Sequence, residues 1–216
     1  MLNRIQAFSC YQDNISEKIV HYQKSVFDLF GMNIVQEYTT INHADFLDEK
    51  INNIDFDIIV FFDIDCIPIT PNLYEYIIDK LSDNNSILGI EQCNIKKDGI
   101  YAGPACFAIT NDVFTKLGKP SFNPTYRSDT GGEFTFNSIE NGVNVKLFNI
   151  KKSLNRKWKC GDKYFGNGTT YDNLLYHQFE LGRYYNHPDL KIYEYQFINK
   201  CKEILKKYEN YSINNN

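Results

Sequence analysis

Between residues 4 and 150, short apolar runs alternate with longer segments in which apolar side chains recur at helical spacing. Residues 57–62 are rich in Ile, Val and Phe without polar alternation, which predicts a parallel strand buried on both faces. Residues 14–30 place apolar side chains on one helical face and are followed by Gly31, which predicts a helix. Strands and helices that alternate in this way favour an α/β layer architecture.

The same pattern gives the order of the other elements. Strands are predicted at residues 4–10, 33–38, 57–62, 86–91, 101–110 and 143–150. Helices are predicted at residues 14–30, 44–54, 72–81, 112–117 and 133–140, with weaker helical signal at 172–181 and 192–208. Residues 151–170 are polar and show no clear period, so we expect an ordered loop over a site. The length of 216 residues predicts one domain over residues 1–210 and a disordered tail at 211–216.

Composition and charge exclude several classes of protein. Hydrophobic residues make up 43% of the chain and aromatic residues 15%, which is enough for a packed core. The net charge of −4 argues against nonspecific nucleic-acid binding, so no nucleic-acid partner is expected. The six cysteines are scattered without a CxxC pair, which predicts reduced thiols rather than a zinc site. No window approaches the roughly 20 apolar residues that cross a bilayer, and no signal peptide is found, so we expect a cytoplasmic protein without a transmembrane segment.

The predicted strand at 57–62 runs directly into two aspartates, Asp63 and Asp65. The carboxyl end of a central parallel strand is where open α/β sheets bind ligands. Because side chains alternate along an extended chain, both acids can serve one ion only if a turn begins at Asp65. One carboxylate then binds a metal, and the other contacts a ribose or a metal-bound water. Hard oxygen ligands favour Mg²⁺ or Mn²⁺ completed by substrate phosphates, so the pair predicts a metal–diphosphate complex; the alternative is a helix cap beside a solvated loop acid.

An apolar strand followed by the motif Asp63-Ile64-Asp65 resembles the GT-A type of nucleotide-sugar-dependent glycosyltransferase, and the resemblance extends from Arg4 to Arg183. It implies a Rossmann-like fold with a mixed, mostly parallel central sheet flanked by helices. It also implies that the motif binds Mn²⁺ or Mg²⁺ together with a nucleotide-sugar, which is a UDP-sugar in most enzymes of this type.

Two further motifs carry the resemblance. The strand YAGPACFAIT is similar to the small-residue strand of GT-A enzymes, and this implies that the backbone at Ala102 and Gly103 approaches the sugar closely. An ordinary buried strand with a Gly–Pro bend is the alternative. The segment SDTGGEF is similar to an acidic segment that opens a helix, which implies Asp129 as the general base and Glu133 as the next candidate. Alternatively, Asp129 caps the helix and Glu133 occupies its first turn.

A third motif, NLLYHQFELGR, ends at Arg183. GT-A enzymes commonly place a histidine late in the chain as a further metal ligand, so the resemblance implies His177 for that role beside Asp65, with Asp63 assisting. Arg183 would neutralise the diphosphate leaving group, as guanidinium groups do. The alternative for a single histidine among aromatic residues is a structural role.

The resemblance also implies a nucleotide site at the end of the first strand. Phe8, Ser9 and Tyr11 occupy the position where GT-A folds usually cradle the base, and His43 lies in a polar patch near the base or ribose. Trp158 lies on the expected loop at 151–170, where its aromatic face could stack on an acceptor sugar.

The function implied is metal-dependent transfer of a sugar from a nucleotide-sugar to a hydroxyl acceptor such as a glycan, with inversion at the anomeric carbon. A haloacid-dehalogenase-like phosphatase also carries DxD after an apolar strand, but position 67 holds Ile where that family usually has Thr or Val. A sugar-phosphate nucleotidyltransferase usually carries a Gly-rich loop after its first strand, and residues 9–18 contain no Gly. A non-catalytic nucleotide-sugar-binding module is the third alternative.

Overall fold

The computed structural model describes the backbone of residues 5–93, 99–182 and 189–214. Along the chain the elements are β1 (Ile5–Tyr11), α1 (Glu17–Leu29), β2 (Val35–Tyr38), α2 (His43–Asn53), β3 (Ile58–Asp63), β4 (Cys66–Pro68), α3 (Leu73–Leu81), β5 (Ser86–Cys93), β6 (Ile100–Thr110), α4 (Asn111–Lys116), α5 (Gly132–Glu140), β7 (Asn144–Phe148), β8 (Ile150–Ser153), β9 (Trp158–Cys160), β10 (Lys163–Phe165), β11 (Thr169–Tyr171), β12 (Leu175–His177) and α6 (Leu190–Asn214).

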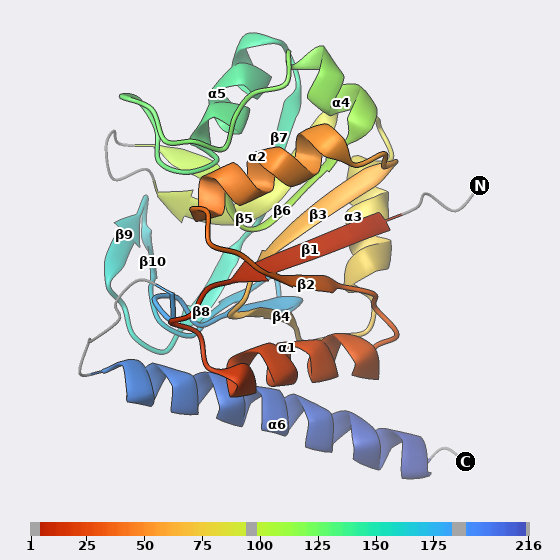
Figure 1. The fold of residues 1–216 in the computed structure, drawn as a ribbon, viewed down its shortest axis with the longest axis vertical. Coiled ribbons are helices and arrows are strands. Elements are labelled where there is room, and N and C mark those ends of the chain that lie inside the picture. Colours follow the sequence, from red (N-terminus) through yellow and green to blue (C-terminus); the bar gives the residue numbers. More distant parts are fainter. Residues whose placement is uncertain (1–4, 94–98, 183–188, 215–216) are drawn as a thin grey trace.

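The central sheet has six strands in the order β2-β1-β3-β6-β5-β7 (Figure 1). Strand β1 is parallel to both β2 and β3, and β5 is parallel to β7. Strand β6 is antiparallel to both of its neighbours, β3 and β5. The predicted mixed, mostly parallel sheet is therefore confirmed, with β6 as the one reversed strand.

Strand β3 occupies the middle of the sheet because its side chains are apolar on both faces. Ile58, Val60 and Phe62 point into the hydrophobic cluster formed with α1 and α3. Ile59 and Phe61 point into the opposite cluster, formed with α2, α4 and α5. The alternation follows the two-residue period of a strand, so each face receives every second side chain.

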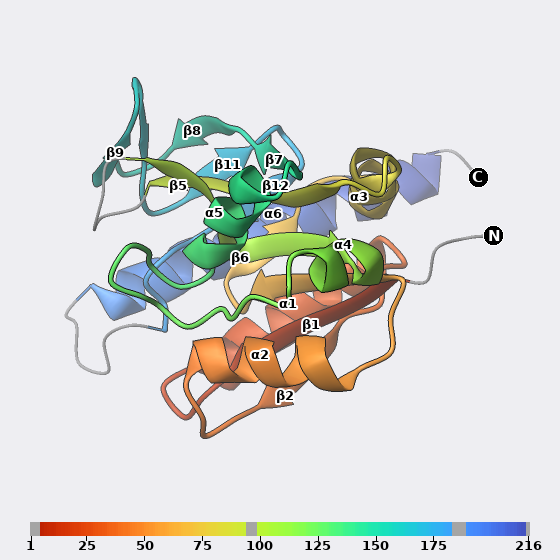
Figure 2. The ribbon, with the colours of Figure 1, turned by 90° about the horizontal axis from the view of Figure 1, so that it is seen from above.

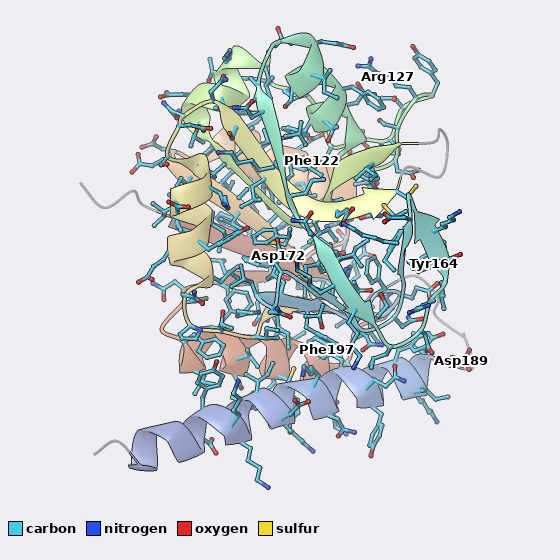
Figure 3. The ribbon with its side chains drawn as sticks, turned by 180° about the vertical axis from the view of Figure 1, so that it is seen from behind. Phe122, Arg127, Tyr164, Asp172, Asp189 and Phe197 are labelled. Carbon is cyan, nitrogen blue, oxygen red and sulfur yellow. The ribbon has the colours of Figure 1, made fainter. Side chains whose placement is uncertain are left out.

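Helices cover both faces of the sheet (Figure 2). Helices α2, α4 and α5 cover one face, whereas α1 and α3 cover the other. Helix α6 lies along the outside of α1, and its fully buried Phe197 fills the contact between them (Figures 1 and 3). In the described part of the chain, no helix combines the length and hydropathy that crossing a membrane requires.

The predicted helix at 172–181 is wrong. Asp172 and Asn173 both have positive φ and form the tight turn between β11 and β12. Two central residues with positive φ are typical of a hairpin turn, and Asp and Asn tolerate this conformation better than other non-glycine residues. Phe179 and Glu180 are also left-handed, so a right-handed helix is excluded over most of the segment.

The predicted loop at 151–170 contains ordered strands. Strands β9 and β10 form a hairpin, and β8 and β11 belong to a second sheet with the order β4-β12-β11-β8. The predicted strand at 143–150 divides into β7 of the central sheet and β8 of the second sheet. Helix α6 continues to Asn214, beyond the predicted boundary at residue 210. All six cysteines are free thiols.

Phe122 should be a major contributor to stability because it lies fully buried beneath α5, with its ring 4.4 to 5.4 Å from those of Phe61, Phe107 and Phe134 (Figure 3). We expect Phe122→Ala to lower the free energy of unfolding by about 3–5 kcal/mol. Ile139→Ala, at an exposed position of α5, should change it by less than about 0.5 kcal/mol. Urea unfolding measures both values, and equal losses would contradict this account of the core.

Candidate functional site

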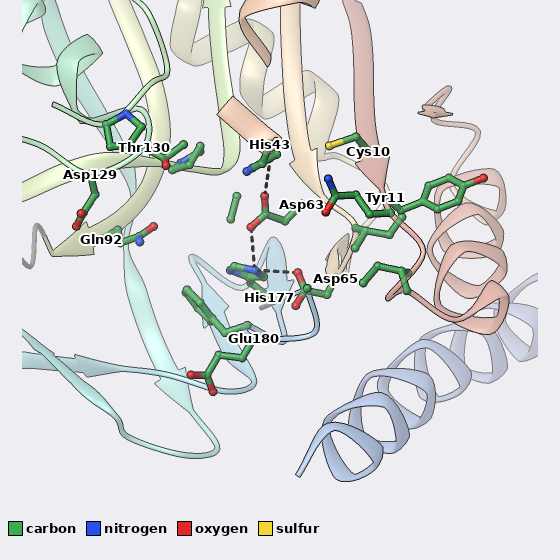
Figure 4. A pocket seen from close by; sticks show the side chains of 18 of the residues that line it. Cys10, Tyr11, His43, Asp63, Asp65, Gln92, Asp129, Thr130, His177 and Glu180 are labelled. Carbon is green, nitrogen blue, oxygen red and sulfur yellow. Dashed lines mark hydrogen bonds and ion pairs between the residues drawn. The ribbon is translucent and has the colours of Figure 1, made fainter. Parts of the chain in front are cut away.

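The sheet order brings the ends of several strands to one edge. Strands β1, β3 and β5 end at this edge, and β6 begins there because it runs in the opposite direction. A cleft of about 550 Å³ opens at the same edge (Figure 4). The cleft wall includes Tyr11, Thr39, His43, Asp63, Asp65, Gln92, Tyr101, Asp129, Thr130, Trp158, Phe165, His177, Phe179 and Glu180.

The two aspartates lie on either side of Ile64, at a sharp turn of the chain. Strand β3 ends at Asp63, Ile64 and Asp65 form the turn, and β4 starts at Cys66. The buried side chain of Gln23 on α1 donates hydrogen bonds to the carbonyl oxygens of Asp63 (2.8 Å) and Cys66 (3.0 Å). This amide therefore fixes both ends of the turn. In the sequence, the only sign of this role is a polar residue on the apolar face of a predicted helix.

The second sheet delivers His177 to the aspartates. Strand β12 pairs antiparallel with β4, and the register places His177 opposite Cys66. The backbone N–H of Gln178 donates to the carbonyl of Asp65 at 3.0 Å, which continues the pairing into the turn. As a result, Nε2 of His177 lies 3.0 Å from Oδ1 of Asp65 and 3.4 Å from Oδ2 of Asp63.

The environment of these three groups is largely desolvated. Asp65 is 4% exposed and His177 is 2% exposed, whereas the side chain of Asp63 reaches the cleft and is 28% exposed. Burial disfavours the charged form of His177, but the negative charges of Asp65 and Asp63 outweigh burial and raise the pKa of His177 to about 9. His43, at the start of α2, lies 3.3 Å from Oδ1 of Asp63 on the side away from His177 (Figure 4).

Asp63, Asp65 and His177 fit a divalent cation. One ligand atom from each residue lies within 4.8 Å of the others. Neighbouring ligands of an octahedral metal at about 2.1 Å are about 3 Å apart, which is close to the observed separations from His177. Two carboxylates suit Mg²⁺ or Mn²⁺, and an imidazole ligand favours Mn²⁺ of the two. The three residues leave the cleft side open for phosphate oxygens.

Asp129 lies on the wall across the cleft from Asp65 (Figure 4). The loop that carries it is tied down at both ends. At one end, the N–H of Phe122 donates to Asp48 of α2 at 2.7 Å. At the other end, the N–H of Gly131 donates to the carbonyl of Phe122 at 2.9 Å, and Gly131 has a φ of 78°, a conformation that glycine adopts without strain. These bonds hold the ends of the loop that carries Asp129 in the cleft wall.

Glu133 is engaged away from the cleft and is not part of its wall. Its carboxylate accepts hydrogen bonds from Thr125 (2.5 Å), Ser128 (2.9 Å) and the guanidinium of Arg127 (2.7 Å at the closest). The Arg127 hydrogen bonds, with those of Thr125 and Ser128, lower the pKa of Glu133 to about 2. Glu133 therefore fixes the loop of Asp129 and has no free access to a substrate in this arrangement.

The residues predicted for the nucleotide and sugar are divided between cleft and core. Tyr11 lines the cleft, whereas Phe8 belongs to the core and Ser9 is buried. Ala102 and Gly103 are buried in the pairing of β6 with β5 and do not belong to the cleft wall.

Arg183, the last residue of the third motif, lies outside the described residues. Lys157, a basic residue near the cleft, forms an ion pair with Glu180 and a hydrogen bond with Tyr193 of α6 at 3.1 Å. Lys163 is paired with the buried carboxylate of Glu91 at 2.8 Å.

An aromatic wall borders the metal-ligand cluster. Trp158, Phe165 and Phe179 contact one another with ring centroids 5.2 to 5.7 Å apart. The ring of Phe179 also packs against the imidazole of His177, with centroids 3.8 Å apart. The sequence indicated Trp158 but not the other two, because the left-handed backbone at Phe179 that turns its ring inward has no local signature.

No family model matches the chain, and no curated sequence does either. Among solved structures, a mannosyltransferase from Pyrobaculum calidifontis in complex with GDP-mannose and Mn²⁺ is similar, with a TM-score of 0.50 and 7% identity over 67% of this chain and 54% of that chain. A Drosophila β1,4-galactosyltransferase 7 complex with manganese, UDP-galactose and xylobiose gives a TM-score of 0.47 and 12% identity, covering 88% of this chain and 79% of that chain. A glucose-1-phosphate thymidylyltransferase from Bacillus anthracis gives 0.43 and 10%, covering 68% and 87% of the two chains.

At such low identities a structural likeness shows the fold alone, and only the first of the three scores is high enough to be informative. The chain has a Rossmann-like mixed α/β fold of the GT-A type, as the sequence predicts. Its cleft lies where this class of fold binds ligands, at the carboxyl ends of the parallel strands.

We expect Asp65→Asn to weaken Mn²⁺ binding by more than about tenfold, because it removes the charge of the most buried carboxylate in the cluster. The electron paramagnetic resonance signal of free Mn²⁺ measures the affinity directly. Asp162→Asn, at an exposed position in the β9–β10 turn, is the matched control and should bind Mn²⁺ as the unaltered protein does. Unchanged affinity in Asp65→Asn would refute the metal assignment.

Glu133→Gln should destabilise the protein by about 1–3 kcal/mol at neutral pH, because a charged hydrogen-bond acceptor is lost. The folded-state pKa of about 2 lies below the usual 4.5, so the carboxylate stabilises the fold fully above pH 4.5 and loses this effect as the pH falls through 2. The difference between the two proteins should therefore shrink between pH 4.5 and pH 2 in urea unfolding. Glu140→Gln breaks only an exposed pair with Arg127 and should cost less than about 1 kcal/mol.

Proposed function

We propose that the protein is a metal-dependent glycosyltransferase that moves a sugar from a nucleotide-sugar to a hydroxyl acceptor such as a glycan, with inversion. The observation that carries the proposal is the arrangement within one cleft of a divalent-metal ligand set, Asp63, Asp65 and His177, across from a separate carboxylate, Asp129. A metal–diphosphate site requires the first, and activation of an acceptor hydroxyl requires the second.

Asp65 and His177 would be the direct protein ligands of Mn²⁺ or Mg²⁺, with Asp63 assisting. The bound metal would supply positive charge that stabilises the departing diphosphate. Burial of Asp65 and His177 keeps water from competing with them, and the hydrogen bonds of Gln23 hold the turn in place. Arg183 remains a proposed further cation for the diphosphate.

Tyr11, Thr39 and His43 form the end of the cleft next to β1 and are proposed to contact the nucleoside. His43 is suited to the ribose, because its ring nitrogen already lies against Asp63 and the two side chains present a donor and an acceptor side by side. Uracil is proposed as the base, since UDP-sugars are the usual donors of enzymes that this sequence resembles.

Asp129 is the proposed general base. As the acceptor oxygen forms a bond to the anomeric carbon, its proton passes to the carboxylate of Asp129. The bond between the anomeric carbon and the diphosphate oxygen breaks with its electron pair remaining on the diphosphate. Attack from the side opposite the leaving group inverts the configuration. Trp158 and Phe165, on the wall near this position, offer aromatic faces to a sugar acceptor.

Asp129→Asn should retain binding of a UDP-sugar with Mn²⁺ and lose transfer by about 100-fold or more, because general base catalysis contributes about 10²–10⁴-fold. Donor binding is measured by calorimetry and transfer by release of UDP with a panel of sugar acceptors. Asp162→Asn serves again as the control and should retain both.

Near-normal transfer by Asp129→Asn would assign the base elsewhere. Donor binding without transfer or slow hydrolysis in the unaltered protein would favour a non-catalytic binding module instead. Release of pyrophosphate from a nucleoside triphosphate and a sugar phosphate would favour a nucleotidyltransferase.

A further inference from the structure

Gln92 on β5 is a cleft residue that the sequence motifs do not include. It lies near the carboxyl end of the strand, paired with Tyr101 of β6, so its backbone is fixed by the sheet. Figure 4 shows its side chain between Asp129 on one side and the Asp63–His177 cluster on the other. This is the part of the cleft where the transferred sugar must lie if the diphosphate is at the metal and the base is Asp129.

Gly103 provides the space for the Gln92 side chain. A Cβ atom at position 103 would lie 2.3 Å from Oε1 and 2.9 Å from Cβ of Gln92. The Cβ of Gln92 and the side chain of Ile90, 3.0 Å away, leave little room for any residue larger than glycine at this position. The sequence predicted that the backbone at Gly103 approaches the sugar closely. In the structure the space beside Gly103 is occupied by Gln92, whose side chain lines the cleft.

The amide of Gln92 makes no hydrogen bond with another side chain or carbonyl of the described residues, whereas other glutamines such as Gln6, Gln23 and Gln36 are bonded within the protein. An amide has two N–H donors and a carbonyl acceptor. Such a group can bind the hydroxyls of a sugar, which both donate and accept. It adds no charge to the site.

The acidic side chains of the surrounding wall outnumber its two histidines, His43 and His177. Asp63, Asp65, Asp129 and Glu180 contribute carboxylates, and the described residues of the cleft wall include neither lysine nor arginine. Lys157, at its margin, is paired with Glu180. The positive charge of a divalent metal between Asp63, Asp65 and His177 would be balanced by the negative charge of the donor's own diphosphate. The metal would therefore not neutralise a further anion on the sugar.

We propose that Gln92 selects the transferred sugar, and that this sugar is uncharged and bears hydroxyl groups, in contrast to a uronic acid. The inference rests on the proposed function and specifies the donor class of the same cleft. Gln92 binds a hydroxyl of the sugar through its amide, and the negative wall disfavours a carboxylate at that position.

The test compares donors that differ only in one carboxylate: UDP-glucose with UDP-glucuronic acid, and UDP-galactose with UDP-galacturonic acid. Calorimetry with Mn²⁺ measures the affinity of each, and of UDP alone, for the unaltered protein and for Gln92→Leu. Gln6→Leu, at a half-buried position of β1 outside the cleft wall, is the matched control for loss of an amide. Thermal unfolding establishes that each variant is folded, and Gln92→Asn provides a second, more conservative change.

The unaltered protein should bind at least one neutral donor about tenfold or more tightly than its acidic counterpart. Gln92→Leu should weaken binding of that neutral donor by about five- to tenfold and leave UDP binding unchanged, as expected for the loss of one or two hydrogen bonds. Gln6→Leu should change neither value. Equal affinity for neutral and acidic donors, or equal weakening of UDP and the UDP-sugar in Gln92→Leu, would overturn the inference.

Failure of the proposed function has a different signature. If GDP binds instead of UDP, GDP-mannose and GDP-mannuronic acid replace the UDP pairs, and the same outcomes decide. If neither UDP nor GDP binds in the presence of Mn²⁺, the proposed function is wrong and the inference about Gln92 is wrong with it.

Discussion

The antiparallel pairing of β4 with β12 is the contact on which the site depends. Asp65 lies in the turn just before β4, and His177 is the last residue of β12. The two side chains meet at 3.0 Å although they are 112 residues apart in sequence. Without this pairing, Asp65 would be a buried carboxylate without its histidine partner, which is costly in free energy. The second sheet therefore completes a binding site at the edge of the first.

Electrostatics explain why this cluster is suited to a cation. Two carboxylates and one imidazole are held within a few ångströms of one another, and burial strengthens their interaction. In the absence of a cation, the raised pKa of His177 lets a proton offset part of the negative charge. A divalent metal held by Asp63, Asp65 and His177 would supply more positive charge at the same point and would take the place of that proton. The two carboxylates repel each other. The hydrogen bonds that Gln23 donates to the carbonyls of Asp63 and Cys66 hold the turn in place against this repulsion.

The prediction of secondary structure was most accurate for local patterns and least accurate for the segments that complete the cleft. The strand that precedes Asp63 could be identified because every residue from Ile58 to Phe62 is apolar. The segment at 172–181 was predicted as a helix because its apolar spacing suits either structure, and the left-handed residues that exclude a helix depend on pairing with distant strands. Gln92 was missed for a related reason: its place in the cleft wall depends on the pairing of β5 with β6.

The sequence alone determined the alternation of strands and helices, the central position of β3 and the two acids at its end, because hydrophobic periodicity and adjacent residues act over a few positions of the chain. Tertiary structure decided which groups meet those acids. It brought His177 to Asp65 and placed Asp129 in the cleft wall. It also paired Glu133 with Arg127 outside that wall. These outcomes depend on strand register and loop geometry, which are fixed by contacts between residues far apart in sequence.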